Sequence, residues 1–422
     1  MTVIRSIRGT RDFYPPEMAR RSWLYENIRK VSESFGYQEY EGPFLEYVEL
    51  YAAKSGDELV KEQSYVFEDR SGELIALRPE LTPTLVRMIG QRQRQLNFPL
   101  RWWSFGPFWR YERPQKGRTR EFFQWNIDLV GVDTPESDAE LVAVAATFFR
   151  QVGLKPQEII LKVNNRRLME SELGKLGLAA GQRDQAFRLI DRRDKTSPEK
   201  WRADAKGLGL SEGQVRKLEG LLGDQNLWES SEELVRFFKA VEALNVQEYV
   251  QYAPEVIRGL DYYTGTVFEA HDSSGEFRAI LGGGRYDDLM AAVGGEALPG
   301  VGFAMGDVVI SLVLERYGCL PNVDELTASD ILVTVFDEAS WLESYKLAAE
   351  LRGSGFRVVC YPQPVKLPKQ FKYADRISAR VALVLGPEEL REGKVTVKNL
   401  LTREQQTIPR AALVEVIRGC LE

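Results

Sequence analysis

The alternation of hydrophobic and polar residues predicts a long β-hairpin in the N-terminal half of the chain. Aromatic and apolar residues run over 105–109 and again over 122–127. Between these arms, the sequence PQKG at 114–117 is typical of a turn, because proline fixes φ and glycine permits a chain reversal. We therefore expect two β-strands within 103–128, joined by this turn.

Hydrophobic residues at helical or alternating spacing predict the neighbouring elements. In chain order these are a helix ending near Gly36, strands over 65–69 and 73–78, a short helix over 84–89, a helix over 137–152 and a strand over 158–163. Glu80 and Thr82 lie between a strand and the short helix. Polar side chains at such a junction either cap the helix or project into a cleft, and the pattern leaves both possibilities open.

The character of the chain changes over 164–250, where short, highly charged helices replace β-branched runs. Leucines at helical spacing predict a small helical domain inserted into a β-rich one. The β-rich pattern resumes at residue 256. The glycines at 282–284 do not match a dinucleotide-binding fingerprint, and we interpret them as a strand end where the backbone passes close to a ligand. A strand over 298–306 then leads into a helix over 307–317.

After a predicted linker at 321–329, strands and helices alternate, which predicts a parallel sheet with crossover helices. The expected elements are strands over 331–336, 357–361 and 381–385, and helices over 341–353 and 365–376. The expected domains are a catalytic domain in two parts, 1–163 and 251–320, a helical insertion over 164–250 and a C-terminal domain over 329–422.

Basic residues recur at steps of three and four in the helix expected over 365–376: Lys366, Lys369, Lys372 and Arg376. This spacing places them along one helix face. The face is a modest RNA-binding signal, and a solvated helix face is the common alternative.

Composition narrows the class of protein: 422 residues, 44% hydrophobic and 28% charged, are typical of a chain with two or three folded domains. The net charge of −6 argues against non-specific coating of nucleic acid, so RNA contacts must come from local patches. Three scattered cysteines fit reduced thiols in a cytoplasm and do not make a zinc site. Because no apolar run approaches about 20 residues and the N-terminus lacks a signal core, we expect neither membrane insertion nor secretion.

Candidate chemistry gathers around the hairpin turn. Five basic residues lie there, opposed only by Glu112: Arg110, Arg113, Lys116, Arg118 and Arg120. Strand alternation would put Arg110 and Glu112 on one face of the first arm. It would put four residues on one face of the second arm: Arg120, Phe122, Gln124 and Asn126. Guanidinium groups bind phosphate oxygens in pairs and aromatic rings stack on bases, which favours a nucleotide site over a merely solvated surface. The single histidine, His271, argues against histidine-based catalysis or metal binding.

Several segments together resemble the histidyl-tRNA synthetase family of class II aminoacyl-tRNA synthetases, and the resemblance covers nearly the whole chain. FWRYERPQKGRTREFFQ is similar to the second class II signature, and VIRGLDYYTGTVFEA to the family's histidine-binding motif. LRPELTP, GGGRYDDL and PGVGFAMG are similar to its other active-site segments, and the ending from DILVTVFD onward to its anticodon-binding domain.

This resemblance implies an α+β fold. It implies an antiparallel-sheet catalytic domain with a helical insertion, a C-terminal α/β anticodon-binding domain and a homodimer. It also implies activation of L-histidine by ATP with Mg²⁺, followed by transfer of the histidyl group to the 3′ end of tRNA(His). Activation is a displacement at phosphorus that depends on placement and charge neutralisation, which arginine, glutamate and glutamine can provide.

The family's histidine-binding positions carry over onto six residues, one of which, Asp128, departs from the family and is described below. Glu80 and Thr82 would hold the amino group of histidine, helped by Gln124. Tyr263, with Tyr262 beside it, would face the imidazole.

The family's nucleotide positions carry over onto the hairpin and onto the histidine motif. Arg110 and Arg258 would act as catalytic residues that hold the α-phosphate and the reacting carboxylate. Glu112 and Phe122 would position the adenine.

One departure from the family concerns its third signature, where the arginine expected on the ATP γ-phosphate is replaced by Val309. A valine cannot neutralise a phosphate, so we expect Arg118 and Arg120 to bind the terminal phosphates. Gln115 and Lys116, at the turn, would contact tRNA.

A second departure is Asp128, which stands where a glutamate commonly meets the imidazole. The main rival interpretation is a non-catalytic relative that binds histidine as a sensor, like the regulatory subunit of ATP phosphoribosyltransferase. The replacement at Val309 favours the sensor. The intact RPQKGR turn, the RGLDYY motif and the anticodon-like domain favour the enzyme.

Overall fold

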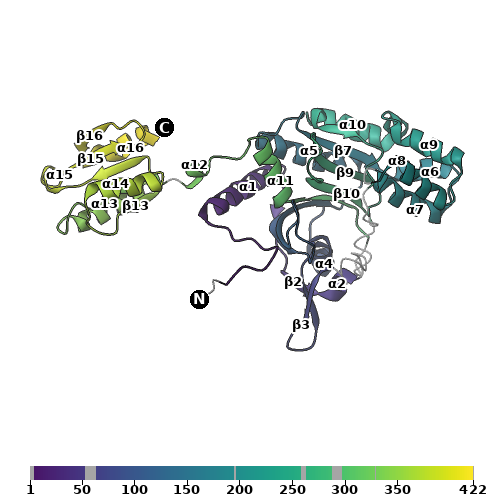
Figure 1. Cartoon of the computed structure of the whole chain (residues 1–422), viewed down its shortest axis with the longest axis horizontal. Helices are drawn as coiled ribbons and strands as arrows, with labels where there is room; N and C mark the ends of the chain where they lie inside the picture. Colours follow the sequence, from purple (N-terminus) through teal and green to yellow (C-terminus); the bar gives the residue numbers. More distant parts are fainter. Residues whose placement is uncertain are drawn as a thin grey trace. The chain divides into compact units, whose positions relative to one another are not determined.

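The computed structural model describes residues 4–52, 63–193, 196–257, 263–287, 297–327 and 329–421. The chain divides into two compact units, Met1–Asp12 with Leu24–Leu320 and Phe13–Trp23 with Pro321–Glu422. Figure 1 shows both units coloured along the sequence. No helix in the described ranges has the length and apolar character needed to cross a bilayer.

The first unit is built on an eight-stranded sheet. In spatial order the strands are β1 (Gln38–Glu39), β5 (Leu100–Trp109), β6 (Glu121–Val130), β11 (Gly300–Gly306), β10 (Leu281–Tyr286), β9 (Thr266–Asp272), β7 (Ile159–Asn165) and β8 (Val250–Tyr252). Only the outer pairs β1·β5 and β7·β8 are parallel. The prediction of a largely antiparallel catalytic sheet is confirmed.

The predicted hairpin is present as β5 and β6, which pair from Leu100 with Val130 to Trp109 with Glu121. The turn is tighter than predicted, because Gly117 takes a φ of +78° and an isolated bridge joins Gln115 to Arg118 across Lys116 and Gly117. The regular ladder therefore ends before the basic residues. The connecting loop, not the strands, carries Arg110, Glu112 and Arg120, which corrects the face assignment made from strand alternation.

Helices cover the two faces of this sheet differently. α1 (Pro15–Ser34) and α5 (Pro135–Gln151) pack on the face formed by the odd-numbered residues of β5 and β6. The Trp103 ring lies 5.9 Å from Tyr25 of α1, and Trp125 lies 5.4 Å from Phe148 of α5, between ring centres.

On the opposite, even-numbered face, α4 (Thr82–Arg92) packs Leu85 and Ile89 against Leu100, Val130 and Tyr286. It is longer than the short helix predicted from the sequence. The short turn η2 (Gln93–Gln95) follows it, and α11 (Asp307–Arg316) continues directly from β11 as expected.

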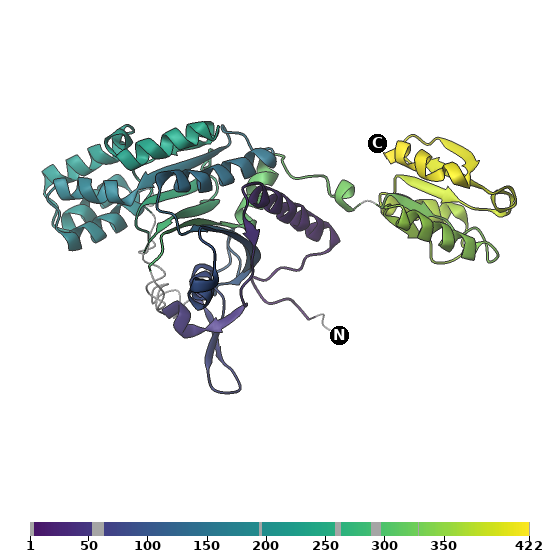
Figure 2. The ribbon, with the colours of Figure 1, turned by 180° about the vertical axis from the view of Figure 1, so that it is seen from behind.

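A second, three-stranded sheet contains β2 (Leu45–Tyr47), β4 (Leu74–Leu77) and β3 (Tyr65–Glu68), with α2 (Val48–Ala52) following β2. Figures 1 and 2 show the β3–β4 hairpin projecting from the first unit. The two strands predicted over 65–78 are therefore confirmed.

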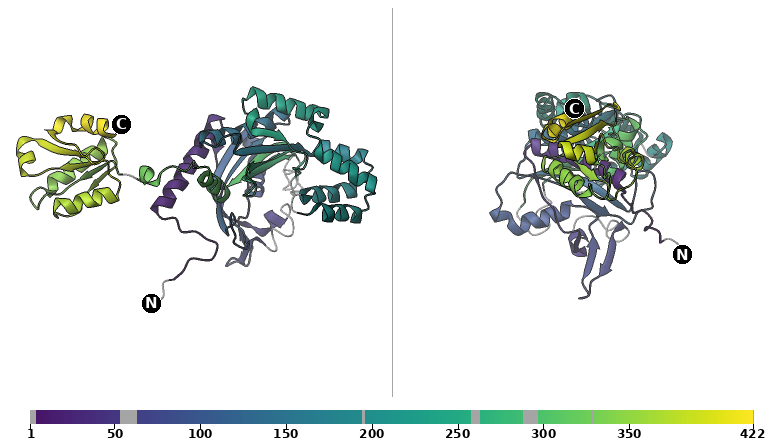
Figure 3. Two further views of the ribbon diagram at one scale, coloured as in Figure 1. Left: turned by 45° about the horizontal axis from the view of Figure 1, so that its top comes forward. Right: turned by 90° about the vertical axis from the view of Figure 1, so that its left-hand side faces the viewer.

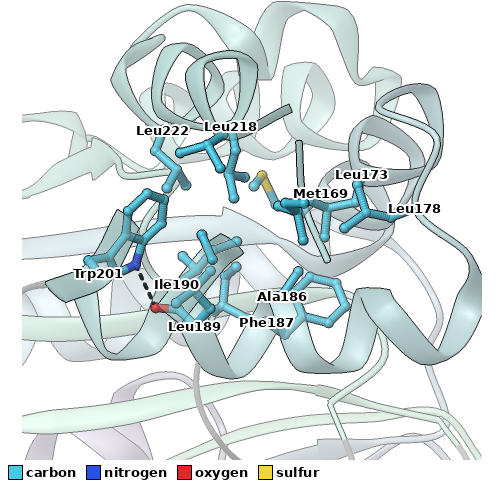
Figure 4. Close-up of a cluster of buried hydrophobic side chains, with 14 residues drawn as sticks. Met169, Leu173, Leu178, Ala186, Phe187, Leu189, Ile190, Trp201, Leu218 and Leu222 are labelled. Atoms are coloured by element: carbon cyan, nitrogen blue, oxygen red, sulfur yellow. Dashed lines mark hydrogen bonds between the residues drawn. The ribbon is translucent and has the colours of Figure 1, made fainter. Parts of the chain in front are cut away.

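The segment between β7 and β8 is helical, as predicted. Its helices are α6 (Arg166–Lys175), α7 (Ala180–Asp191), α8 (Pro198–Gly207), α9 (Glu212–Gly223), η4 (Leu227–Ser230), α10 (Glu232–Ala243) and η5 (Gln247–Tyr249). α6 to α9 share one core, in which the Trp201 indole donates to the Leu189 carbonyl oxygen at 2.9 Å (Figure 4). α10 packs instead on α5.

The glycines of β10 lie inside the strand, so their interpretation as a strand end was wrong. A Cβ on Gly283 would lie 2.5 Å from the Phe303 Cβ. A Cβ on Gly284 would lie 2.8 Å from the Tyr263 Cδ1. Close packing of the chain's own rings therefore requires both glycines.

The second unit has a five-stranded sheet of order β13 (Val358–Cys360), β12 (Ile331–Val333), β14 (Val381–Val384), β15 (Lys394–Asn399) and β16 (Gln405–Pro409). Its helices are α12 (Val323–Thr327), α13 (Trp341–Gly353), α14 (Leu367–Arg376), α15 (Pro387–Glu392), η7 (Arg410–Ala412) and α16 (Leu413–Leu421). α13 and α16 share a core on one sheet face and α14 packs on the other, within the yellow-green unit of Figure 3.

The predicted parallel strands are confirmed as β13, β12 and β14. The sequence interpretation did not include β15 and β16, which extend the sheet in antiparallel fashion. It also did not include the short helix α12, which lies inside the predicted linker.

Candidate active site

The site residues of the first unit lie on the even-numbered face of the large sheet, opposite α1 and α5. Gln124, Asn126 and Asp128 alternate along β6 on this face, because their neighbours point into the α5 core. Gly306, Ala304 and Gly302 of β11 lie directly opposite them. Small residues therefore lie beside polar ones across this pair of strands.

Asp128 is buried on this face. Asp128 is only 6% exposed, and the Tyr286 hydroxyl donates a hydrogen bond to its Oδ1 at 2.6 Å. A Cβ on Gly302 would lie 2.1 Å from the same oxygen, so only glycine fits opposite. Burial raises the pKa of the Asp128 carboxyl to about 7, although the Tyr286 hydrogen bond lowers it.

Tyr263 lies on the same face of the sheet, against β10, two strands away from β6. Tyr263 is buried, and its ring packs against Gly284 of β10. Gly284 pairs with Gly302 in the sheet, and Gly302 pairs in turn with Asp128. The structure therefore brings Tyr263 and Asp128 to one face. Arg258 and Tyr262, the other members of the predicted histidine motif, lie outside the described residues.

Glu80 and Thr82 lie where β4 gives way to α4. The alternative that they cap this helix is wrong for Thr82, because Leu81 is the N-cap residue and no side-chain capping hydrogen bond forms there. Both residues are half-buried. The preceding Pro79 carbonyl oxygen accepts a hydrogen bond from Arg110 Nε at 2.9 Å, so this junction adjoins the hairpin loop.

Arg110 and Phe122, which the sequence analysis predicts to contact the nucleotide, lie against each other at the hairpin loop. The Arg110 guanidinium lies 5.4 Å from the centre of the Phe122 ring, and Phe108 stacks on Phe122 at 5.9 Å between ring centres. Glu112, which is half-buried, forms an ion pair with Arg118 at 3.2 Å. The loop thus holds an aromatic ring, two guanidiniums and a carboxylate close to one another.

Arg120 is held differently from Arg118. Its guanidinium lies 4.1 Å from the centre of the Tyr111 ring, and its Nε donates to the Glu112 carbonyl oxygen at 3.2 Å. Gly9 packs against its side chain, since a Cβ on Gly9 would lie 2.8 Å from the Arg120 Cγ. Arg120 therefore packs against the N-terminal segment and Tyr111.

Two structurally important charged residues were missed in the sequence interpretation. Arg78 is fully buried and donates to the Pro107 carbonyl oxygen at 2.9 Å while pairing with Glu41. Asp307 accepts from the Phe123 N–H and from Arg11 Nη2, both at 2.8 Å. In the sequence, Arg78 is recognisable only as an arginine before Pro79, and Asp307 only as an aspartate where the family has an aliphatic residue. Neither feature predicts which residue the side chain pairs with.

The predicted tRNA-facing residues have different environments. Lys116 forms an ion pair with Glu276 at 2.6 Å, and Gln115 is exposed beside it. In the second unit the four predicted cations are all exposed: Lys366, Lys369, Lys372 and Arg376. The last three lie on α14, opposite buried Gln370 and Ala374, whereas Lys366 precedes the helix as its N-cap residue, which corrects its predicted place on the helix face. Within the described ranges none of these four forms an ion pair. Across the same ranges, no group of three or more His, Cys, Asp or Glu side chains could hold a metal ion.

Comparisons with known proteins agree with this architecture. The family model described as histidyl-tRNA synthetase matches residues 9–307, and the model of the anticodon binding domain matches residues 330–419. The histidine–tRNA ligase of Opitutus terrae is 36% identical over 434 residues, covering 99% of each chain.

Two solved structures share the fold. The histidyl-tRNA synthetase from a Nostoc species has a TM-score of 0.86 at 25% identity, covering 99% of this chain and 100% of that one. A Bacillus halodurans protein titled ATP phosphoribosyltransferase regulatory subunit/histidyl-tRNA synthetase has a TM-score of 0.71 at 22% identity, covering 86% of this chain and 94% of that one. The second likeness shows the fold alone, whereas the family matches include the anticodon-binding domain. This chain belongs to the histidyl-tRNA synthetase family of class II aminoacyl-tRNA synthetases.

Proposed function

We propose that this chain activates L-histidine with ATP to histidyl-adenylate and transfers the histidyl group to the 3′ end of tRNA(His). The observation that carries the proposal is a single face of the large sheet together with the hairpin loop that adjoins it. A buried carboxylate, Asp128, and the Tyr263 ring lie on the sheet face, and the Arg110–Phe122 pair borders it through Pro79. Such an arrangement suits an amino acid and a nucleotide held side by side.

The site residues have separate tasks in this proposal. Asp128 and Tyr263, with Tyr262, recognise the imidazole, while Glu80, Thr82 and Gln124 hold the amino group. The adenine ring stacks on Phe122 between Glu112 and Arg110. Arg110 and Arg258 hold the α-phosphate and the attacking carboxylate, and ATP enters as its Mg²⁺ complex. Fixed guanidiniums stabilise charge that develops at phosphorus without themselves transferring protons.

The remaining parts of the chain bind tRNA and form the dimer in this proposal. We assign 1–163 and 251–320 to the catalytic domain, 164–250 to an insertion and 329–422 to anticodon binding in a cytoplasmic enzyme. The exposed cations of α14 suit the RNA backbone.

A homodimer is supported by the small sheet of the first unit. Residues that pair across β2, β4 and β3 place apolar side chains on one face, and three of them are exposed: Leu45, Tyr47 and Phe67. Contiguous exposed apolar surface of this kind is typical of protein interfaces.

Histidine-dependent exchange of pyrophosphate into ATP tests the activity. The enzyme is expected to show exchange that requires histidine, and then to charge tRNA(His). A protein that binds histidine but supports no exchange would instead be a histidine sensor, the reading favoured by Val309.

A further inference from the structure

Arg278 lies in the connection between β9 and β10, outside every motif discussed above. Its side chain is exposed, and it makes no ion pair within the described part of the chain. The chain positions it at the hairpin turn, since a Cβ on Gly117 would lie 3.8 Å from the Arg278 Cδ and 3.6 Å from the Val309 Cγ2. Arg278 and Val309 therefore flank the same glycine.

The hairpin turn is held against this connection by its neighbours. Lys116 Nζ pairs with Glu276 Oε1 at 2.6 Å and lies 5.0 Å from the centre of the Phe277 ring. These contacts place Arg278 beside the loop that carries Arg110 and Arg118. They also neutralise Lys116, so the uncompensated positive charge is on the arginines.

The charges around Arg278 do not balance. Although the side chain is exposed, partial desolvation by the surrounding protein lowers the pKa of Arg278, and the positive charges of Arg118 and Arg110 lower this pKa further. Among the residues that the structure describes, Glu112 is the carboxylate that raises this pKa, and it is already paired with Arg118. Three guanidiniums around one carboxylate repel each other unless an anion joins them.

We propose that Arg278 binds the β- and γ-phosphates of ATP, together with Arg118, at the position where Val309 offers no charge. The proposal rests on the proposed function for the location of adenine and the α-phosphate. In the reaction, a histidine carboxylate oxygen forms a bond to the α-phosphorus. The bond from that phosphorus to the bridging oxygen breaks, and pyrophosphate leaves with the electron pair. Arg278 stabilises the charge that accumulates on this leaving group.

Binding measurements on the full chain separate the terminal phosphates from the rest of the nucleotide. Arg278→Ala should weaken binding of a non-hydrolysable ATP analogue by about 10- to 100-fold, since one charge-assisted contact to phosphate is lost. AMP, which lacks those phosphates, should bind within about 2-fold of its wild-type affinity. Arg278→Lys should retain part of the affinity because the positive charge remains.

Arg316→Ala is the matched control. Arg316 is an exposed arginine whose Nε lies 3.7 Å from Glu276 Oε2, near the same turn but paired to a carboxylate. Its replacement should change neither affinity. Adding Val309→Arg to the Arg278→Ala variant should restore much of the binding of the ATP analogue. Thermal unfolding of each variant shows whether it is folded.

The outcomes distinguish this proposal from the proposed function. Unchanged affinity for the ATP analogue in folded Arg278→Ala overturns the role of Arg278. An equal loss of ATP analogue and AMP binding also overturns it, because the residue would then act on the loop or the α-phosphate. If wild-type protein shows no histidine-dependent exchange while the Arg278 effect on the analogue persists, the proposed function fails and the phosphate contact stands.

Discussion

Asp128 leads to a prediction about stability as well as recognition. The residue is 6% exposed and its Oδ1 accepts the Tyr286 hydroxyl at 2.6 Å. Burial raises its pKa from 3.8 to about 7. The native protein therefore keeps a proton on Asp128 at pH values where the unfolded chain has already released it.

The sign of the pH dependence follows from this difference. Because the native pKa is raised, the stabilising contribution of Asp128 is complete below about pH 4 and is lost as the pH rises towards 7. Each pKa unit corresponds to about 1.4 kcal/mol, so the loss amounts to at most about 4 kcal/mol. Above pH 7 the ionised carboxylate remains a destabilising buried charge.

Asp128→Asn removes this charge and retains an oxygen that can accept the Tyr286 hydrogen bond. We expect the variant to be more stable than wild type at pH 8, by up to about 4 kcal/mol, and to show little difference at pH 4. Urea denaturation followed by tryptophan fluorescence measures the change, because Trp103 and Trp125 are buried in the same unit. Histidine affinity should fall in the same variant, since the imidazole loses its carboxylate partner.

Asp272→Asn serves as the control for burial. Asp272 is 4% exposed and accepts the Phe277 N–H at 3.1 Å, so removing its charge should not stabilise the protein at pH 8. If Asp128→Asn lowered the unfolding free energy at pH 8 as much as at pH 5, the carboxylate would be well stabilised in the native state. The reasoning from burial would then be refuted.

Three further predictions concern the core, the tRNA surface and the dimer. Arg285→Leu should lower the free energy of unfolding, measured by urea denaturation, by about 3–5 kcal/mol. Arg285 pairs with Asp138 at 2.7 Å, and without it Asp138 would remain buried and unpaired. A decrease below about 1 kcal/mol would contradict this reasoning. Lys366→Glu with Lys369→Glu should raise the KM for tRNA and flatten its salt dependence while exchange without tRNA is unchanged. If exchange also collapsed, the patch would belong to the fold. Tyr47→Glu with Phe67→Glu should shift sedimentation towards the monomer, and an unchanged dimer would place the interface elsewhere.

Local pattern was sufficient to predict most secondary structure. Alternating apolar residues identified the β5–β6 hairpin, and helical spacing identified α13 at Trp341–Gly353. These elements depend on periodicity and turn residues that lie within a few positions of one another. The motif resemblance likewise needed only short segments, so the family and the replacement at Val309 could be read directly from the chain.

Tertiary structure alone decided the environment of individual charges. Asp128 and Tyr286 are 158 residues apart, and only sheet pairing brings the hydroxyl to the carboxyl whose pKa is raised. Arg278 lies between Phe277 and Ala279, and no local motif marks it as a ligand-binding residue. It becomes a candidate phosphate ligand because the pairing of Lys116 with Glu276 brings the hairpin turn to it. Electrostatic free energy depends on burial and on distances between residues far apart in sequence, which the pattern of a single chain does not contain.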